Sequence, residues 1–285
     1  MIPSQFKYLR AQSVEEAISM LQETNGEGKI LAGGHSLVPL LKFRITTPGT
    51  LVDITRIPGL KNVRVEDGRL IVGALKTHFE ISKDEKIIEN IPSLAKTASE
   101  TGDLQVRNYG TIGGNIVHGD PVADYPAIAL ALDAELKVEG EDGTEMMPVD
   151  GFALGPLITM MPENALVTEV SFEIPPDHVA QTYLKYTHPA TGYPLVGVAA
   201  IAGTDDDGAI DYIRIGITGV SDVSYRARPV EEFLMGKKPD EDLMREAADL
   251  AIEDAEMGSD LFASPEYREH ITKVYVRRAL NEVLK

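Results

Sequence analysis

The sequence predicts an α+β protein with two domains. Up to about residue 140, short apolar runs typical of buried strands alternate with apolar residues at helical spacing. From residue 166 onward, longer runs of alternating apolar and polar residues predict an antiparallel sheet, and two helical patterns end the chain. The consecutive Pro175 and Pro176 interrupt this second pattern, so we expect domains of residues 1–176 and 177–285.

The first domain begins with a helix. Ser13 and Glu16 have the spacing of a capping box, and the apolar stripe behind them ends near Gly26. A short strand at 29–32 then runs into a glycine pair and a brief helical turn through 37–41. The other elements expected in this domain are strands at 50–54, 70–74 and 135–139, and helices after Thr77, at 92–101 and at 125–132.

The second region contains the long alternating strands. We expect these strands to form one antiparallel sheet, because Pro-Pro, His-Pro and acidic turn sequences separate them. They span residues 166–174, 182–186, 195–202 and 210–218. Two helices follow at 240–257 and 265–284, and the second has Ser264 as its N-cap and Pro265 in its first helical position.

Charge and composition exclude several classes of function. The net charge of -18 disfavours nucleic acid and anionic membranes as partners, because both would repel this chain. Apolar runs stay far below the roughly 20 residues that span a bilayer, and the start MIPSQFKYLR lacks a signal-peptide core, so we expect a cytoplasmic protein. With no cysteine, any redox chemistry in this chain needs a bound organic cofactor or a metal held by His and carboxylates, and the absence of an HExxH pattern disfavours the metal.

Two glycine pairs are the strongest functional signals. They are AGGHS at 32–36 and TIGGN at 111–115, each after an apolar strand-like run and each ending in a hydrogen-bonding side chain. Adjacent glycines let the backbone approach an anion and point successive N–H groups at it. One such pair is more often an ordinary turn, but two predict a diphosphate held between separate parts of the chain. No GxGxxG or GxxxxGK[ST] motif is present, which disfavours a Rossmann or P-loop site.

Polar residues near the glycine pairs have competing roles. Asp124 either caps the helix that begins at Tyr125 or accepts hydrogen bonds from ribose hydroxyls, and Asp120 is expected to be a turn residue before Pro121. His35 and His118 are expected to make structural hydrogen bonds, since no partner is spaced to form a catalytic relay. Tyr193 either packs at the start of a strand or stacks on a flat cofactor.

AGGHSLVPLLKFR and TIGGNIVHGDPVADYPA, at this separation, resemble the FAD-binding medium subunit of the molybdenum hydroxylases, with carbon monoxide dehydrogenase medium chains the nearest likeness. The resemblance spans essentially the whole chain. It implies a PCMH-type FAD-binding domain with lobes at about 1–55 and 56–176, followed by a C-terminal domain of antiparallel sheet and helices.

The resemblance also implies particular FAD contacts and no catalytic residue in this chain. Asp124 matches an acidic residue on the adenosine side of FAD, which favours the ribose role over capping. Lys185 and Tyr193 fall where the C-terminal domain of the family approaches the isoalloxazine. The two pyrophosphate loops match Ala32, Gly33, Gly34, His35 and Ser36, and Thr111, Ile112, Gly113, Gly114 and Asn115.

The same resemblance implies a complex. Its other members are a large molybdopterin subunit and a small 2Fe–2S subunit, commonly doubled into a dimer of heterotrimers. This chain is then the FAD-binding electron-transfer subunit, which takes electrons from the 2Fe–2S clusters and passes them to NAD, a quinone or another acceptor. Two other hypotheses stay open on the residues alone: a free-standing flavin oxidase of an alcohol or sugar, and a non-catalytic nucleotide-binding adaptor.

Overall fold

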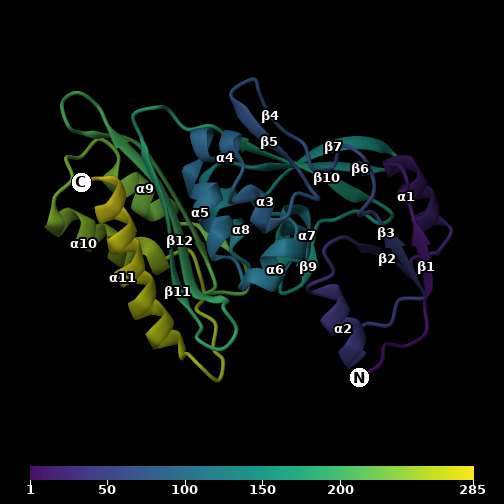
Figure 1. Ribbon diagram of the computed structural model, residues 1–285. Helices are drawn as coiled ribbons and strands as arrows, with labels where there is room; N and C mark the ends of the chain where they lie inside the picture. The colour runs from purple at the N-terminus through teal and green to yellow at the C-terminus, as the bar shows by residue number, and fades with distance from the viewer.

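The computed structural model describes residues 1–285 and arranges them as three lobes in a row (Figure 1). In Figure 1 the N-terminal lobe lies on the right, the middle lobe at the centre and the C-terminal domain on the left. The two termini are therefore at opposite ends of the molecule. None of the helices combines the length and the apolar character needed to cross a membrane.

The N-terminal lobe is a three-stranded parallel sheet in the order β1-β3-β2. Ser13 caps the first helix as predicted, since its hydroxyl accepts a hydrogen bond from the Glu16 amide at 3.1 Å. A small core around Ala17, Leu21 and Val52 holds helix and sheet together. The elements are β1 (Lys7–Arg10), α1 (Val14–Gln22), β2 (Gly28–Leu31), α2 (Leu37–Phe43) and β3 (Thr50–Asp53).

The middle lobe is built on a five-stranded antiparallel sheet in the order β4-β5-β10-β6-β7. Six helices pack beside it, and a two-stranded hairpin, β8-β9, joins them. The strands are β4 (Val63–Glu66), β5 (Arg69–Gly73), β6 (Glu135–Gly140), β7 (Gly143–Pro148), β8 (Ala153–Gly155), β9 (Ile158–Thr159) and β10 (Leu166–Glu173). The helices are α3 (His78–Ile81), α4 (Glu85–Asn90), α5 (Pro92–Glu100), α6 (Leu104–Tyr109), α7 (Ile112–Val117) and α8 (Tyr125–Ala131).

The strand expected at 166–174 is present, but its predicted sheet is wrong. This strand, β10, lies at the centre of the middle-lobe sheet between β5 and β6, and not in the C-terminal sheet. Its inward residues Val170 and Phe172 belong to the middle-lobe core. Alternation reports which face of a strand is buried, and any antiparallel sheet satisfies it equally. Periodicity therefore could not identify the neighbours of this strand.

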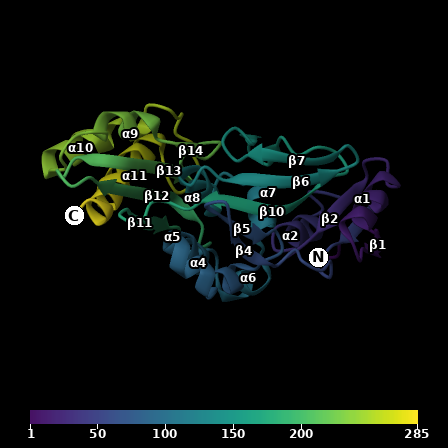
Figure 2. The same ribbon diagram turned by 90° about the horizontal axis from the view of Figure 1, so that it is seen from above.

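The C-terminal domain is a four-stranded antiparallel sheet in the order β11-β12-β13-β14, covered on one face by helices (Figure 2). Helix α8 of the middle lobe packs against β12 and β13, and Tyr183, Ala199 and Ile201 join the middle-lobe core. The elements are β11 (Ala180–Thr187), β12 (Pro194–Thr204), β13 (Ile210–Thr218), β14 (Tyr225–Arg226), α9 (Arg228–Leu234), α10 (Glu241–Asp249), the 3-10 turn η1 (Leu250–Ile252) and α11 (Pro265–Val283).

The helix expected at 240–257 is shorter than predicted. Helix α10 ends at Asp249, and after the turn η1 the chain runs without helix to Ser264. Glu253, Asp254 and Glu256 follow directly, and negative charge at a helix C-terminus opposes the helix dipole. Electrostatics thus ends this helix before its apolar pattern does. The final helix matches its prediction within one residue, with the Ser264 hydroxyl accepting from the Tyr267 amide.

Candidate cofactor-binding site

The first glycine loop, residues 32–36, connects β2 to α2 and presents free backbone donors. None of the four amides from Gly33 to Ser36 donates a hydrogen bond within the chain. Gly34 adopts a φ of 72°, which a side chain would strain. The imidazole Nδ1 of His35 lies 2.9 Å from the Gly33 carbonyl oxygen and stabilises the turn. Successive unpaired amides are the donors expected of an anion cradle.

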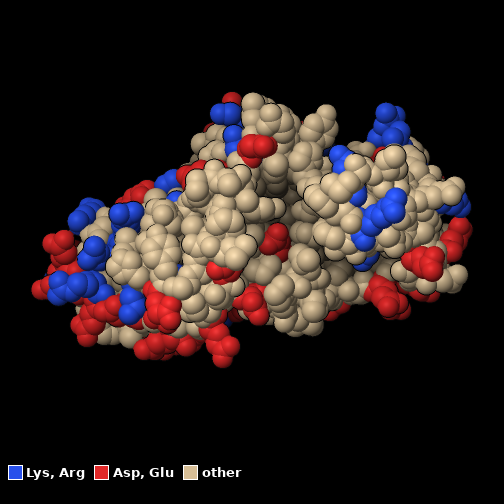
Figure 3. Space-filling view, turned by 90° about the horizontal axis from the view of Figure 1, so that it is seen from below, with Lys and Arg blue, Asp and Glu red and all other residues tan.

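The first loop lies directly against the turn that precedes the second. A Cβ added to Gly33 would lie only 2.1 Å from the carbonyl oxygen of Tyr109, so only glycine permits this approach. The ring of His35 stacks on the ring of Tyr109 at 5.6 Å with an interplanar angle of 11°. Figure 3 shows the surface hollowed between the N-terminal lobe, on the right, and the middle lobe. The two glycine loops, which are far apart in the sequence, thus lie close together, as the sequence predicts.

The second loop, residues 111–115, does not follow a strand as predicted. Helix α6 precedes it, and Thr111 caps the short helix α7 with its hydroxyl. Two of its amides are used inside the fold, because Ile112 donates to the Lys76 carbonyl at 3.1 Å and Gly113 to the Ala74 carbonyl at 3.0 Å. The prediction that successive amides point at an anion is therefore wrong for this loop.

What the second loop offers is more limited. Gly114 is exposed, and its amide makes a long bond of 3.3 Å to the Thr111 hydroxyl. The Thr111 amide donates to no acceptor within the chain. Gly113, by contrast, is buried, and a Cβ there would lie 2.7 Å from the Cβ of Ala74. The two glycines thus have different roles: Gly113 permits packing and Gly114 leaves the surface open.

Asn115 has a buried side-chain oxygen, Oδ1, without a hydrogen-bond partner in the chain. A buried oxygen of this kind costs free energy unless something donates to it. Ser36 at the first loop caps α2 without any side-chain hydrogen bond. Neither loop contains Lys or Arg, so an anion here would be held by backbone dipoles and neutral side chains.

Asp124 forms a buried ion pair between the domains. Its Oδ1 accepts from the Lys185 ammonium at 2.9 Å and from the Tyr183 hydroxyl at 2.8 Å, and its side chain is 2% exposed. Burial raises the pKa of this carboxyl, and the Lys185 ammonium opposes the shift. The capping hypothesis is wrong, since Asp124 makes no cap hydrogen bond to α8. The Thr101 side chain also lowers the pKa of this carboxyl by hydrogen bonding.

Lys185 is the other member of this ion pair. Its side chain is 1% exposed, and the ammonium also donates to the Glu100 carbonyl at 2.8 Å. These bonds hold Lys185 between Asp124 and the end of α5, against which β11 packs. The contact of Lys185 with the isoalloxazine stays a prediction.

Of the remaining predicted residues, Asp120 and His118 have structural roles, and Tyr193 is partly exposed. Asp120 is a turn residue as expected, with Oδ1 accepting from the Val122 amide at 3.1 Å. Burial lowers the pKa of His118, consistent with a neutral structural residue. Tyr193 is 43% exposed and precedes β12. Burial, followed by the carboxylates of Asp120 and Asp124, raises the pKa of its phenol.

Sequence reasoning missed two residues that contact the loops or the turn between them, one exposed and one buried. Tyr109 joins the first loop to the second, and its only signal is the Tyr-Gly pair just before TIGGN. His78 is 3% exposed, bonds the Tyr125 hydroxyl through Nδ1 at 3.0 Å, and donates its amide to the Gly110 carbonyl. Burial lowers the pKa of His78 to about 3, so it is neutral. No spacing pattern connects His78 with either loop.

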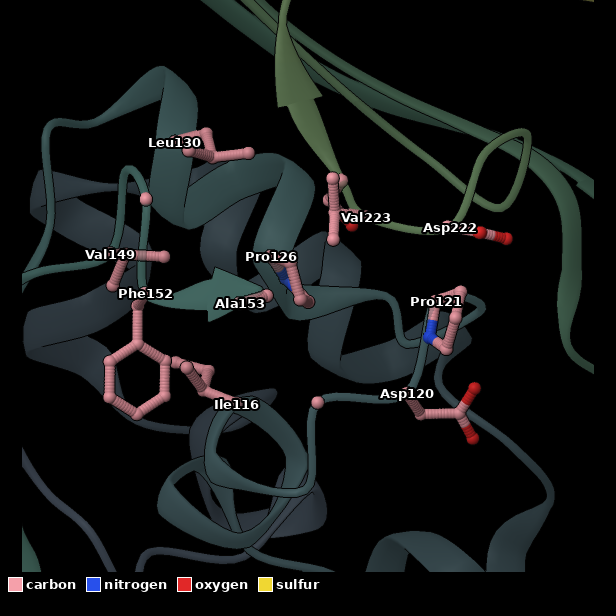
Figure 4. Close-up of a pocket in the computed structure, with 13 residues that line it drawn as sticks. Ile116, Asp120, Pro121, Pro126, Leu130, Val149, Phe152, Ala153, Asp222 and Val223 are labelled. Carbon is pink, nitrogen blue, oxygen red and sulfur yellow. The ribbon is translucent and has the colours of Figure 1, made fainter. Parts of the chain in front are cut away.

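A separate pocket lies behind the second loop, at the C-terminal end of α7 (Figure 4). Ile116, Leu130 and Phe152 line one side, and Asp120 and Asp222 lie at the other. It contains neither the free amides of the first loop nor the Asn115 oxygen. The candidate site for an anionic cofactor is therefore the cleft that the two loops share.

Free amides in the first loop and an unpaired amide oxygen in the second are features suited to an anionic nucleotide cofactor. Comparison with protein families is consistent with such a cofactor. Residues 4–176 match the model for the FAD binding domain in molybdopterin dehydrogenase, and residues 181–283 match the CO dehydrogenase flavoprotein C-terminal domain. The chain therefore belongs to the FAD-binding medium subunits of the molybdenum hydroxylases, which confirms the predicted family, fold class and cofactor, FAD.

Individual relatives cover nearly all of the chain. The carbon monoxide dehydrogenase medium chain of Hydrogenophaga pseudoflava is 34% identical over 281 residues, 99% of this chain and 98% of the relative. The glyceraldehyde dehydrogenase medium chain of Sulfolobus acidocaldarius is 34% identical over 284 residues, which are 99% of this chain and 100% of the relative. A solved carbon monoxide dehydrogenase of Hydrogenophaga pseudoflava superposes with a TM-score of 0.95 at 35% identity, covering 99% and 98% of the two chains. Membership of a medium-subunit family disfavours the free-standing oxidase and adaptor hypotheses.

Proposed function

We propose that this chain holds FAD in the cleft between its N-terminal and middle lobes and serves as the electron-transfer subunit of a molybdenum hydroxylase. When bound, FAD supplies the redox chemistry, because flavins accept and release electrons that protein side chains cannot carry. The observation that supports this most strongly is the run of four unpaired amides from Gly33 to Ser36, adjacent to the second loop. These amides would hold the pyrophosphate without a cationic side chain.

Other polar groups would complete the binding site. The hydroxyl of Ser36 and the unpaired Oδ1 of Asn115 would each bond the cofactor, and the Gly114 amide would add a backbone donor. For Asp124 to accept a ribose hydroxyl, cofactor binding would have to open its enclosed carboxylate, which is 2% exposed. A neutral Asn115 can supply an acceptor for N–H or O–H groups of the cofactor without adding charge.

The proposed assembly follows from the relatives and from the absence of cysteine. A relative from Paenarthrobacter nicotinovorans is described as a subunit of the 6-hydroxypseudooxynicotine dehydrogenase complex, 31% identical to this chain. With no cysteine, this chain has no thiolate ligands for an iron–sulfur cluster. We infer a small 2Fe–2S subunit and a large molybdopterin subunit as partners, in a dimer of heterotrimers, with NAD or a quinone as the acceptor.

Substituting Gly114 tests the binding proposal. A Cβ at this exposed glycine would meet only the Thr111 hydroxyl, at 2.9 Å, so Gly114→Val changes the cradle with little disturbance of the core. We expect the variant to purify folded but without flavin. The measurements are the flavin absorbance per chain after incubation with FAD and the circular dichroism spectrum of the same sample.

Gly155→Val is the matched control, because no atom lies within 4 Å of a Cβ added there. This control should retain FAD at the level of the wild-type chain. A folded Gly114→Val chain that carries a full complement of FAD would contradict the proposed site. Absence of flavin from the wild-type chain, even after reconstitution, would contradict the function itself.

A further inference from the structure

The connection between β11 and β12, residues 188–193, is a closed loop that ends in Tyr193. The His188 amide donates to the Tyr193 carbonyl at 2.8 Å, and the Gly192 amide donates back to the His188 carbonyl at 2.9 Å. Gly192 has a φ of 74°, which completes the tight turn. These bonds join the two ends of the loop. They leave the amides at its tip in need of an acceptor.

The imidazole of His188 is that acceptor. Its Nδ1 lies 3.2 Å from the amide nitrogen of Ala190 and 3.2 Å from that of Thr191, and both amides donate to it. A ring nitrogen that accepts amide hydrogens carries no proton of its own. The residue is 6% exposed. One buried side chain therefore determines the path of the loop backbone.

A distant segment holds the imidazole in place. The ring of Phe262, in the connection between α10 and α11, packs edge-on against His188 at 4.2 Å and 79°. Asp260 fixes Phe262, because its Oδ1 accepts from the Phe262 amide at 2.8 Å and its Oδ2 from the Arg268 guanidinium at 2.6 Å. Arg268 also donates to the Leu195 carbonyl at the start of β12. The loop is thus braced from the side away from the middle lobe.

On its other side the loop meets the middle lobe. The backbone of Gly102 lies 3.7 Å from the position of a Cβ at Gly192. Tyr193, next in the chain after this contact, is 43% exposed. The loop therefore carries an aromatic residue from the C-terminal domain to the surface of the middle lobe.

We propose that His188 is a positioning residue: its Nδ1 shapes the 188–193 loop so that Tyr193 is held against the bound flavin, and Phe262 keeps the imidazole in register. The contact of Tyr193 with flavin rests on the proposed function. The role of His188 in shaping the loop does not depend on it. His188 itself does not touch the cofactor. The chemistry required of it is that of an acceptor of two amide hydrogens.

Two substitutions separate the acceptor from the packing. His188→Leu removes the nitrogen, whereas His188→Asn returns an oxygen acceptor at a similar distance from the backbone. In the full chain without cofactor, we expect amide hydrogen exchange at Ala190 and Thr191 to be about tenfold faster in the Leu variant, the effect of one typical hydrogen bond. The Asn variant should exchange at the wild-type rate. Equal acceleration in both variants would overturn the acceptor role.

Flavin fluorescence of the full chain loaded with FAD tests the positioning itself. An aromatic ring stacked on a flavin quenches its fluorescence, so His188→Leu and Tyr193→Leu should each raise the fluorescence per bound FAD, measured with the FAD content of each sample. The double variant should be no brighter than Tyr193→Leu, because both changes remove the same contact. Unchanged fluorescence in His188→Leu, or additive effects in the double variant, would overturn the inference. A wild-type chain that binds no FAD would instead reject the proposed function, and the exchange result would still decide whether His188 shapes the loop.

Discussion

Replacing Lys185 with methionine gives a sharp test of the interface between the two domains. Methionine keeps an unbranched apolar stem of similar length but removes the ammonium. In the wild-type chain that ammonium bonds Asp124 and the Glu100 carbonyl, and both charged side chains are almost fully enclosed, at 1% and 2% exposure. The substitution therefore leaves a buried carboxylate without its cationic partner, with only the neutral side chains of Tyr183 and Thr101 as donors.

The size of the effect follows from this enclosure. Removing one partner of a buried ion pair typically costs about 3 to 5 kcal/mol, because the remaining charge has no compensation. A surface pair would cost at most about 1 kcal/mol. We therefore expect Lys185→Met to lower the free energy of unfolding by about 3 to 5 kcal/mol at neutral pH. The double variant Asp124→Asn/Lys185→Met should recover most of this loss, since it leaves no charge behind.

The loss should also depend on pH in a definite direction. Burial raises the pKa of Asp124 above its ordinary value of 3.8, and Lys185 opposes that shift, so removing Lys185 raises this pKa further. A carboxyl with a raised folded-state pKa binds a proton more tightly when folded, which adds stability as pH falls through that pKa. The deficit of Lys185→Met should therefore shrink between about pH 7 and about pH 4.

Urea unfolding followed by circular dichroism and tyrosine fluorescence, repeated across this pH range, measures the effect. Tyrosine is the suitable probe because the chain has no tryptophan. Lys238→Met, at an exposed lysine without an ion pair, controls for the loss of one positive charge. A deficit that is the same at both ends of the pH range, or no larger than that of Lys238→Met, would refute the reasoning.

Two further outcomes follow from the geometry. Gly33→Ala should lose FAD and about 1 to 3 kcal/mol of stability, because the added Cβ would lie 2.1 Å from the Tyr109 oxygen and force the two loops apart. FAD titration and urea unfolding measure this, with Gly155→Ala as the unhindered control, and wild-type FAD affinity in Gly33→Ala would contradict it. Burial lowers the pKa of His78 from 6.5 to about 3, so the unfolded chain binds a proton that the folded chain refuses, and stability falls as pH drops through that range. His78→Gln should flatten this part of the stability curve, and an unchanged slope would show that another group is responsible.

The sequence predicted helix caps well but did not predict which strands pair with one another. Ser13 and Ser264 were predicted as helix caps and act as caps, because a capping hydrogen bond spans only three residues and depends on little else. The strand at 166–174 was predicted in the wrong sheet, since strand pairing joins residues about a hundred positions apart, such as Phe172 with Leu70. Local patterns cannot report such distant partners.

The candidate site shows the same division. The AGGHS and TIGGN motifs were predictable as ligand loops because glycine pairs have a local conformational meaning. Which amides remain free was not predictable. Those of the first loop have no acceptor in the chain, whereas Ile112 and Gly113 donate to the carbonyls of Lys76 and Ala74, just after β5. The ion pair of Lys185 with Asp124 was likewise not predictable, because it joins residues 61 positions apart.

By itself the sequence determined the class of this protein: a cysteine-free, acidic, two-domain α+β chain with two glycine loops and the family resemblance those loops carry. The tertiary structure alone decided that Gly33 lies against Tyr109, that His188 holds the loop of Tyr193 with help from Phe262, and that Asp124 and Lys185 form a buried pair. The physical reason is the sequence separation of the residues that interact. Turn conformation and capping depend on neighbours a few residues apart, whereas close approach, burial and charge pairing depend on which distant surfaces the fold brings together.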